Sequence, residues 1–188
     1  GSKHVRTFER SVDNKVDGKT LARVESRSGT LINEHYFNLD LNMLRGMDND
    51  DDFEKKIFAK CTKFRDRGHL NIFFIKLNIP AGEKLNGDDI EYLVDGLLLT
   101  PANDLFVMPI LDLDGLEKDE KIATYNSFVK DVLDKKNSNA VGTLNVGLSI
   151  PAYYPRKRIP DLFSLYVNEN ALPTFVSIDF INNRITDT

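Results

Sequence analysis

Hydrophobic residues along the chain gather in five short runs that predict buried β-strands. The runs cover residues 34–41, 71–79, 105–113, 143–150 and 174–180. In the second run, Ile72, Phe73, Phe74 and Ile75 follow one another without a polar residue. Near-continuous apolar runs are typical of strands in a parallel sheet, because helices bury both of its faces. The pattern therefore predicts five parallel strands.

Between these runs, apolar residues recur at three- and four-residue spacing, which predicts helices. The first helix should begin at the aspartates 50–52 and end before Gly68. Three more helices are expected: one begins after Asp88, one covers residues 119–136, and one begins at Pro160. Because consecutive parallel strands need crossover connections of this length, the alternation predicts an α/β fold.

The even spacing of the strands narrows the topology. A repeat of about 35 residues is that of a TIM-like (β/α) barrel, which closes at about eight units. Only five units are found, so we expect a partial or truncated TIM-like barrel. The alternative is a small open doubly wound α/β sheet. Residues 1–2 are typical of a cloning scar. Residues 3–32 predict an N-terminal β-hairpin extension, with one arm over residues 5–8, a second over residues 21–24 and a polar turn over residues 13–18. Residues 33–188 are expected to form the βα-repeat domain.

Composition excludes several classes of protein. The 188 residues are 41% hydrophobic, which is enough for a core. With 25 Lys and Arg against 29 Asp and Glu, the net charge is -4, so we expect no nucleic-acid partner. No apolar run approaches the length of a membrane span, so we expect no membrane partner. The single cysteine excludes an internal disulfide and fits a cytoplasmic location.

Polar residues follow the predicted strands at their carboxyl ends, where α/β folds bind ligands. We predict Asp112, Asp114 and Asp179 as catalytic acid or base groups, because neighbouring carboxylates shift one another's pKa. Asp40 and Asn78 are predicted to bind the ligand. Oxygen ligands of this kind also suit Mg²⁺, and no other cofactor is evident. In the alternative interpretation, these aspartates cap the helix or turn that follows each strand.

A basic loop follows the fourth predicted strand. It reads Tyr153-Tyr154-Pro155-Arg156-Lys157-Arg158. Arginine binds phosphate or carboxylate in a bidentate manner, and tyrosine stacks on rings. We therefore predict Tyr154, Arg156 and Arg158 as ligand-binding residues and an anionic small molecule as the ligand. The alternative is a solvated loop ahead of the last helix.

The segment from Ile110 to Leu116 contains the motif Asp-Leu-Asp-Gly after a hydrophobic strand. It resembles the first motif of haloacid dehalogenase-type phosphatases. That resemblance implies Asp112 as the nucleophile, Asp114 as the general acid or base, and Mg²⁺ beside them. The sequence departs from the family at Leu116, where the motif has threonine.

Three functions stay open at this point. The first is a (β/α) domain that binds or transforms a polar, anionic small molecule at the C-terminal ends of its strands. The second is a non-catalytic binding or assembly domain of a larger protein, and the third is a Mg²⁺-dependent phosphatase, so whether the chain is an enzyme is undecided. A partial barrel leaves an open sheet edge, which predicts a homo-oligomer or another partner that covers it.

Overall fold

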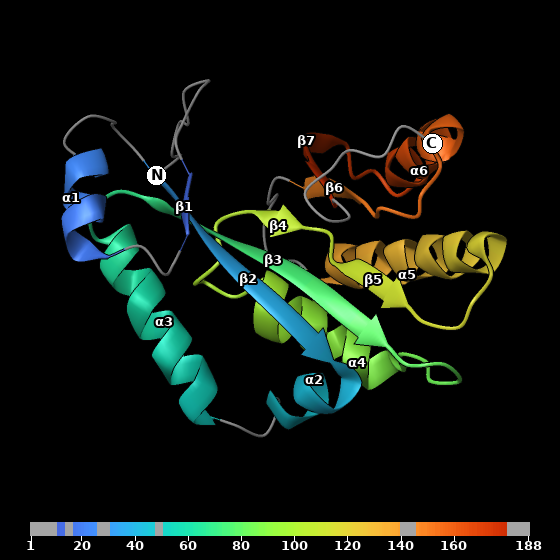
Figure 1. The fold of residues 1–188 in the computed structure, drawn as a ribbon, viewed down its shortest axis with the longest axis horizontal. Coiled ribbons are helices and arrows are strands. Elements are labelled where there is room, and N and C mark those ends of the chain that lie inside the picture. Colours follow the sequence, from blue (N-terminus) through green and yellow to red (C-terminus); the bar gives the residue numbers. More distant parts are fainter. Residues whose placement is uncertain (1–10, 14–16, 26–30, 48–50, 140–145, 180–188) are drawn as a thin grey trace.

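The fold consists of parallel strands in two sheets with helices packed against them (Figure 1). The computed structural model describes residues 11–13, 17–25, 31–47, 51–139 and 146–179. One sheet contains, in spatial order, β1 (Ser11–Asp13), β2 (Ile32–Asp40), β3 (Leu70–Ile79) and β5 (Ile110–Leu113). The other contains β4 (Phe106–Val107), β6 (Val146–Ile150) and β7 (Pro173–Ile178). The predicted α/β class is therefore confirmed.

Neighbouring strands follow one another in chain order. In the first sheet β1, β2, β3 and β5 pair in parallel, and in the second β4, β6 and β7 do so. A bridge between Ile72 and Leu105 links β3 to the segment that leads into β4. The described strands show no reversal of order, which a doubly wound sheet requires. The described strands do not close into a barrel either.

The predicted strand over residues 105–113 is in fact two strands that belong to different sheets. β4 pairs with β6, and β5 pairs with β3. Between them lies Pro109, which has no N–H group to donate to a strand ladder. Met108 still donates its backbone N–H to the carbonyl of Gly147 at 3.1 Å. This interruption is where the chain passes from one sheet to the other.

The predicted N-terminal hairpin is wrong in its described part. Its second arm is a helix, α1 (Gly18–Glu25), and β1 pairs with β2 in parallel. Residues 3–10, which include the predicted first arm, lie outside the described residues. The N-terminal region therefore contributes a strand, a helix and a parallel connection to β2, like the units that follow it.

Asp17 and Gly18, the last two residues of the expected hairpin turn, lie at the start of the helix instead. The Asp17 carboxylate accepts the backbone N–H groups of Lys19 and Thr20 at 2.9 and 3.0 Å, as an N-cap does. Leu21 and Val24, three residues apart on α1, pack against one small core cluster. Aspartate is favoured both as a helix N-cap and in turns, so an aspartate before a short amphipathic segment is compatible with either structure.

Helices occur at the four predicted places, and α1 and α2 are two further α-helices among the described residues that were not predicted. The observed elements are α2 (Leu41–Met47), α3 (Asp51–Arg65), α4 (Gly87–Glu91) continued by the π-helix η1 (Tyr92–Leu98), α5 (Lys118–Ser138), the 3₁₀ turn η2 (Arg156–Arg158) and α6 (Ile159–Asn168). Of the two unpredicted helices, α2 follows β2 directly. No helix in the described ranges is both long and apolar enough to cross a membrane.

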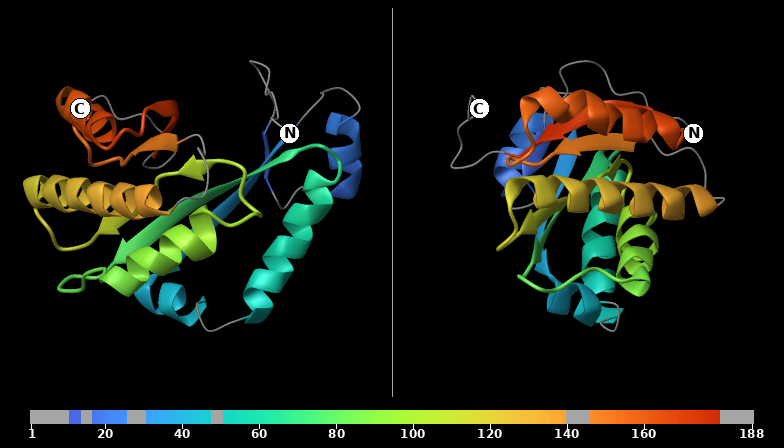
Figure 2. Two further views of the ribbon diagram at one scale, coloured as in Figure 1. Left: turned by 180° about the vertical axis from the view of Figure 1, so that it is seen from behind. Right: turned by 90° about the vertical axis from the view of Figure 1, so that its right-hand side faces the viewer.

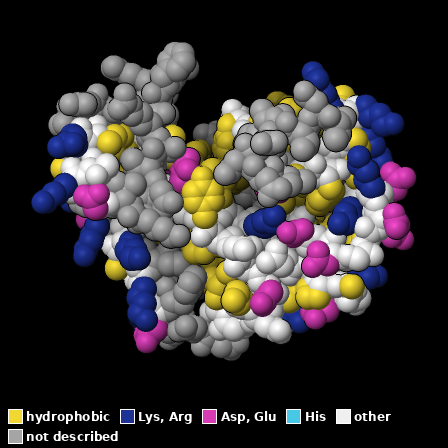
Figure 3. Space-filling view, viewed as in Figure 1, with side chains coloured by type: hydrophobic (Ala, Val, Ile, Leu, Met, Phe, Trp, Pro, Cys, Tyr) yellow, Lys and Arg dark blue, Asp and Glu magenta, His cyan; other side chains and the backbone are white. Residues whose placement is uncertain are grey.

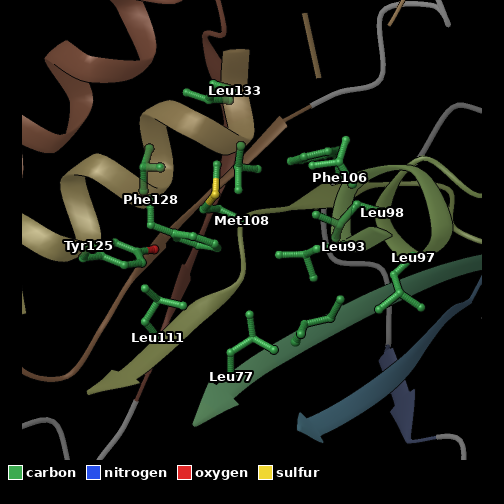
Figure 4. Close-up of a cluster of buried hydrophobic side chains, with 14 of the residues drawn as sticks. Leu77, Leu93, Leu97, Leu98, Phe106, Met108, Leu111, Tyr125, Phe128 and Leu133 are labelled. Carbon is green, nitrogen blue, oxygen red and sulfur yellow. The ribbon is translucent and has the colours of Figure 1, made fainter. Parts of the chain in front are cut away.

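One hydrophobic core joins the two sheets. Helix α5 lies between the part of the molecule with β6, β7 and α6 and the part with β2, β3 and α4 (Figure 2). The close-up in Figure 4 shows buried side chains from both parts, among them Leu77, Leu93, Leu97, Leu98, Phe106, Met108, Leu111, Tyr125, Phe128 and Leu133. Tyr125 is fully buried, and its hydroxyl donates to the carbonyl of Ser149 at 3.0 Å.

Candidate functional site

The first sheet has one face covered by helices and one face that is largely open. Along β2, and along β3 from Phe73 onward, the odd-numbered residues are the more buried and the even-numbered residues are the more exposed. The side chains of the open face are Glu34, Tyr36, Asn38, Phe74, Lys76, Asn78 and Asp112. Figure 3 shows this side of the molecule, with hydrophobic side chains over β2 and β3 beside lysine or arginine and acidic side chains.

Three charged residues meet on the open face. The Lys76 Nζ lies 3.1 Å from Asp112 Oδ2 and 3.8 Å from Asp179 Oδ2. Lys76 comes from β3 and Asp112 from β5, whereas Asp179 follows β7 in the other sheet. We call these three residues the lysine cluster. Of the predicted catalytic aspartates, the structure thus brings together Asp112 and Asp179, around a lysine that was not predicted.

Tyr153 lies beside the lysine cluster. Burial, followed by the negative charges of Asp112 and Asp179, raises the pKa of its hydroxyl, so the phenol is neutral. The phenol oxygen is buried and has no hydrogen-bond partner among the described residues. The Nζ of Lys121 lies 5.9 Å from the centre of the ring. Tyr153 is therefore a second site residue that sequence reasoning did not select.

An aromatic pair occupies the same face toward the amino ends of the strands. The rings of Tyr36 and Phe74 stack with centres 5.2 Å apart and planes 15° apart. The Tyr36 hydroxyl donates to Glu34 Oε2 at 2.5 Å, although the side chain is 60% exposed. The pair gives the open face a flat apolar surface next to its charged end.

The two predicted ligand-binding residues at strand ends, Asp40 and Asn78, do not belong to the lysine cluster. Asp40 Oδ1 accepts the backbone N–H of Met43 at 2.8 Å, so Asp40 caps α2. This is the helix-capping alternative considered for the strand-end aspartates. Asn78 lies on the open face, where its amide donates to Asn38 Oδ1 at 3.2 Å and its backbone is in register with Asp112.

The basic loop divides between the core and the surface. Tyr154 is only 5% exposed, and its hydroxyl donates to Asn126 Oδ1 at 2.9 Å, so it belongs to the core. Arg158 forms ion pairs with Asp161 at 3.3 Å and Asp119 at 4.0 Å. Arg156 is exposed. Of the three predicted ligand-binding residues in this loop, Arg156 is thus the most exposed to solvent.

Asp114 lies at a cavity on the other side of the sheet, where β3 and β5 end. We call it the end cavity. Its volume is about 350 Å³, and its lining is formed by Ile79, Pro80, Gly82, Glu83, Lys84, Leu85, Ile90, Leu111, Leu113, Asp114, Leu116, Thr124, Ser127, Phe128 and Asp131. Asp112 contacts Lys76 on the open face instead. The phosphatase resemblance implies that the two aspartates act in one site, and the observed contacts assign them to different ones.

The described residues offer no ready metal centre. Within these ranges, no group of three or more His, Cys, Asp or Glu side chains is arranged to hold a metal ion. In the lysine cluster, the two carboxylates face an ammonium group instead of a cavity for a cation. Binding of Mg²⁺ by strand-end aspartates stays a prediction.

A buried polar network lies between the first sheet and α3. Cys61 Sγ is 3.5 Å from His35 Nε2, and Asn71 Oδ1 accepts from Asn33 Nδ2 at 2.9 Å. Cysteine, histidine and asparagine together are a known set for nucleophilic catalysis. However, Cys61 is fully buried, and burial raises the pKa of its thiol to about 11. The thiol is therefore protonated and closed to a substrate, so the network is structural.

Comparisons of the chain with protein-family models, with curated protein sequences and with solved structures find no match. A function is therefore inferred from the chemistry of the open face itself. Its most informative residue, Lys76, does leave a signal in the sequence. It interrupts the apolar run Ile75-Lys76-Leu77, and a charged residue within a buried strand needs a polar partner or solvent.

Proposed function

We propose that this chain is a (β/α) domain that binds a polar, anionic small molecule on its open face, at the lysine cluster. The observation that carries the proposal is the contact of Lys76 with Asp112 and Asp179, which come from two different sheets. A strand lysine held by residues so distant in the sequence needs the whole fold to position it. Such convergence of polar groups is typical of binding sites.

The strand order supports a partial TIM-like barrel as the framework of this site. The parallel strands follow in chain order, as they do in (β/α) barrels. In that arrangement the open face corresponds to the inside of the barrel, and the lysine cluster lies toward the carboxyl ends of the strands. Barrel enzymes bind their substrates at this end.

The geometry around Lys76 favours an anionic group in the ligand. Asp112 contacts the ammonium closely, whereas Asp179 is near the limit for an ion pair at 3.8 Å. A phosphate or carboxylate can replace Asp179 on Lys76 while Asp112 stays in place. The neutral hydroxyl of Tyr153 supplies a hydrogen-bond donor, and the exposed Arg156 adds positive charge at the same end of the fold.

The proposal is tested by titration with glucose 6-phosphate, with inorganic phosphate and glucose as comparisons, followed by amide NMR shifts. We expect glucose 6-phosphate to shift the amides around Lys76, Asp112 and Tyr153. Lys76→Met should weaken its binding at least about fivefold, which corresponds to about 1 kcal/mol. The matched control is Lys130→Met, on the exposed side of α5. Equal binding of glucose, or an equal loss in both variants, would contradict the proposal.

A second copy of the chain is the partner we expect at the open edge of the second sheet. β7 pairs only with β6 among the described strands, and it exposes Val176 and Ile178 at 46% and 50%. An edge strand with exposed apolar side chains favours association. Sedimentation should detect a dimer that Ile178→Lys dissociates and Thr174→Lys, on the same strand, weakens less. A monomer at all concentrations would refute this prediction.

A further inference from the structure

The end cavity has the size and the floor of a small-molecule site. Its volume of about 350 Å³ falls within the range of known ligand pockets, about 300–1,000 Å³. The floor is formed by Ile79, Leu85, Ile90, Leu111, Leu116 and Phe128. An apolar cavity of about 150 Å³ already admits benzene, so this one has room for a bicyclic ring. The size and the apolar floor of the cavity therefore favour a ligand with a compact apolar ring system.

The rim of the cavity is predominantly acidic. It carries the carboxylates of Glu83, Asp114 and Asp131 and the single ammonium of Lys84. Glu83 also interacts with the positive charge of Arg45, so Asp114 and Asp131 are the main negative charges that the rim presents to a ligand. Asp114 follows β5, and Asp131 lies on α5, so the two carboxylates belong to different walls. A positively charged group of a ligand is therefore favoured between these two walls.

The α5 wall adds neutral polar groups to these charges. Thr124, Ser127 and Asp131 line the cavity from successive turns of the helix, and all three are exposed. Hydroxyl and carboxylate oxygens accept hydrogen bonds, and an ammonium group only donates them. The wall is therefore complementary to a protonated amine at the rim, above an apolar body on the floor.

From this juxtaposition of floor and rim, we propose that the end cavity binds a small apolar molecule that carries a cationic amine. The site lies on the helix side of the sheet, whereas the lysine cluster lies on the open face. It also selects the opposite ligand charge. The inference is thus independent of the function proposed above.

Two probes with the same body and opposite charge test the proposal. Tryptamine and indole-3-propionate share an indole ring, and one carries an ammonium where the other carries a carboxylate. In NMR titrations, tryptamine should bind at least about fivefold more tightly, a difference of about 1 kcal/mol. Its shifts should map to residues 79–85, 111–116 and 124–131. Added salt should reduce the preference, because it screens the rim charges.

Variants separate the contributions of rim and floor. Asp131→Asn should weaken tryptamine binding about threefold to tenfold and leave indole-3-propionate unchanged or slightly tighter. Asp88→Asn removes the same charge from an exposed position on α4 outside the lining, and it should change neither affinity. Ser127→Trp places a large side chain at the cavity and should abolish binding of both probes. Its circular dichroism spectrum and melting temperature establish that it folds.

Three results would overturn the proposal. The first is equal affinity for tryptamine and indole-3-propionate, and the second is the absence of saturable binding of either probe up to roughly 5 mM. The third is tryptamine binding that persists unchanged in the folded Ser127→Trp variant. None of these outcomes bears on the lysine cluster, which glucose 6-phosphate and Lys76→Met test separately.

Discussion

At the scale of single residues, the clearest consequence of burial concerns the only cysteine of the chain. Cys61 is fully buried, and burial raises the pKa of its thiol to about 11. At pH 8 a thiol with this pKa is about 0.1% thiolate, and the thiolate is the reactive form. We expect Ellman's reagent to react with folded protein at least about a hundredfold more slowly than with denatured protein.

The measurement is the absorbance change on adding the reagent at pH 8, with and without denaturant. Because the sequence holds one cysteine, the amplitude in denaturant must equal one thiol per chain. Denatured protein is also the control for reagent activity. Native reaction within about tenfold of the denatured rate would mean that Cys61 is accessible, and the interpretation of its network with His35 as structural would be wrong.

The candidate site was predictable in part at this scale. The sequence locates strand ends, and this suffices to select Asp112 and Asp179, which do meet. The sequence does not show that Lys76 contacts both aspartates. That contact depends on how the two sheets pack, because Asp179 follows a strand of the other sheet. Tyr153 and Tyr154 could not be distinguished from the sequence either. Adjacent residues point in different directions, and only the fold decides that Tyr154 is buried in the core.

At the scale of elements, an ion pair between the exposed Arg45 and the buried Asp89 ties α2 to α4. Arg45 donates from Nε and Nη2 to the two oxygens of Asp89, both at 2.8 Å, and Asp89 is 4% exposed. The same carboxylate accepts the backbone N–H of Asn86, the N-cap of α4. Chiefly because of its hydrogen bonds with Arg45, the pKa of Asp89 lies below its usual value.

Asp89→Asn should therefore destabilise the protein by about 1–3 kcal/mol at pH 7, because it removes the charged acceptor of the two hydrogen bonds from Arg45. Because the pKa of Asp89 is lower in the folded state than in the unfolded state, its ionised form stabilises the folded protein at pH values above the unfolded-state pKa. This stabilisation is lost as the pH falls through the folded-state pKa. The difference between wild type and variant, measured by urea unfolding, should shrink below about pH 4. Asp88→Asn, in the same turn but exposed, is the control. A difference that is independent of pH would contradict this account.

Element boundaries were predictable where local chemistry decides them. Helices α3, α5 and α6 follow apolar spacing and occur where expected. Two places show the limit of local chemistry. Asp17 caps a helix as readily as it makes a turn, so α1 was mistaken for a hairpin arm. Pro109 lies within an apolar run and splits it into β4 and β5, and only the pairing partners reveal that the halves belong to different sheets.

At the scale of the whole molecule, the even spacing of the units predicted parallel strands in chain order, and the described strands follow it. The same spacing could not reveal that the strands divide into two sheets. That division depends on the pairing of a two-residue strand, β4, with β6. The side chains at this junction are deeply buried: Phe106 is 0% exposed and Met108 is 1% exposed.

The junction predicts how the molecule unfolds. Phe106 and Met108 belong to the same core cluster as Leu77 and Leu111 of the first sheet and Leu148 of the second. Because one continuous core serves both sheets, neither can lose its packing while the other keeps its own. We therefore expect a single cooperative transition in urea, in which tyrosine fluorescence and far-ultraviolet circular dichroism coincide.

Phe106→Ala tests this coupling. Removal of a fully buried phenylalanine should cost about 3–5 kcal/mol and move both probes to a lower urea midpoint together. Phe163→Ala, at a position on α6 that is 37% exposed, is the matched control and should cost clearly less. Separation of the two probes in the variant, with one keeping the wild-type midpoint, would show that the sheets unfold independently. The core at β4 would then be a contact between two units, and the site formed by Lys76, Asp112 and Asp179 would be lost as soon as the less stable unit unfolds.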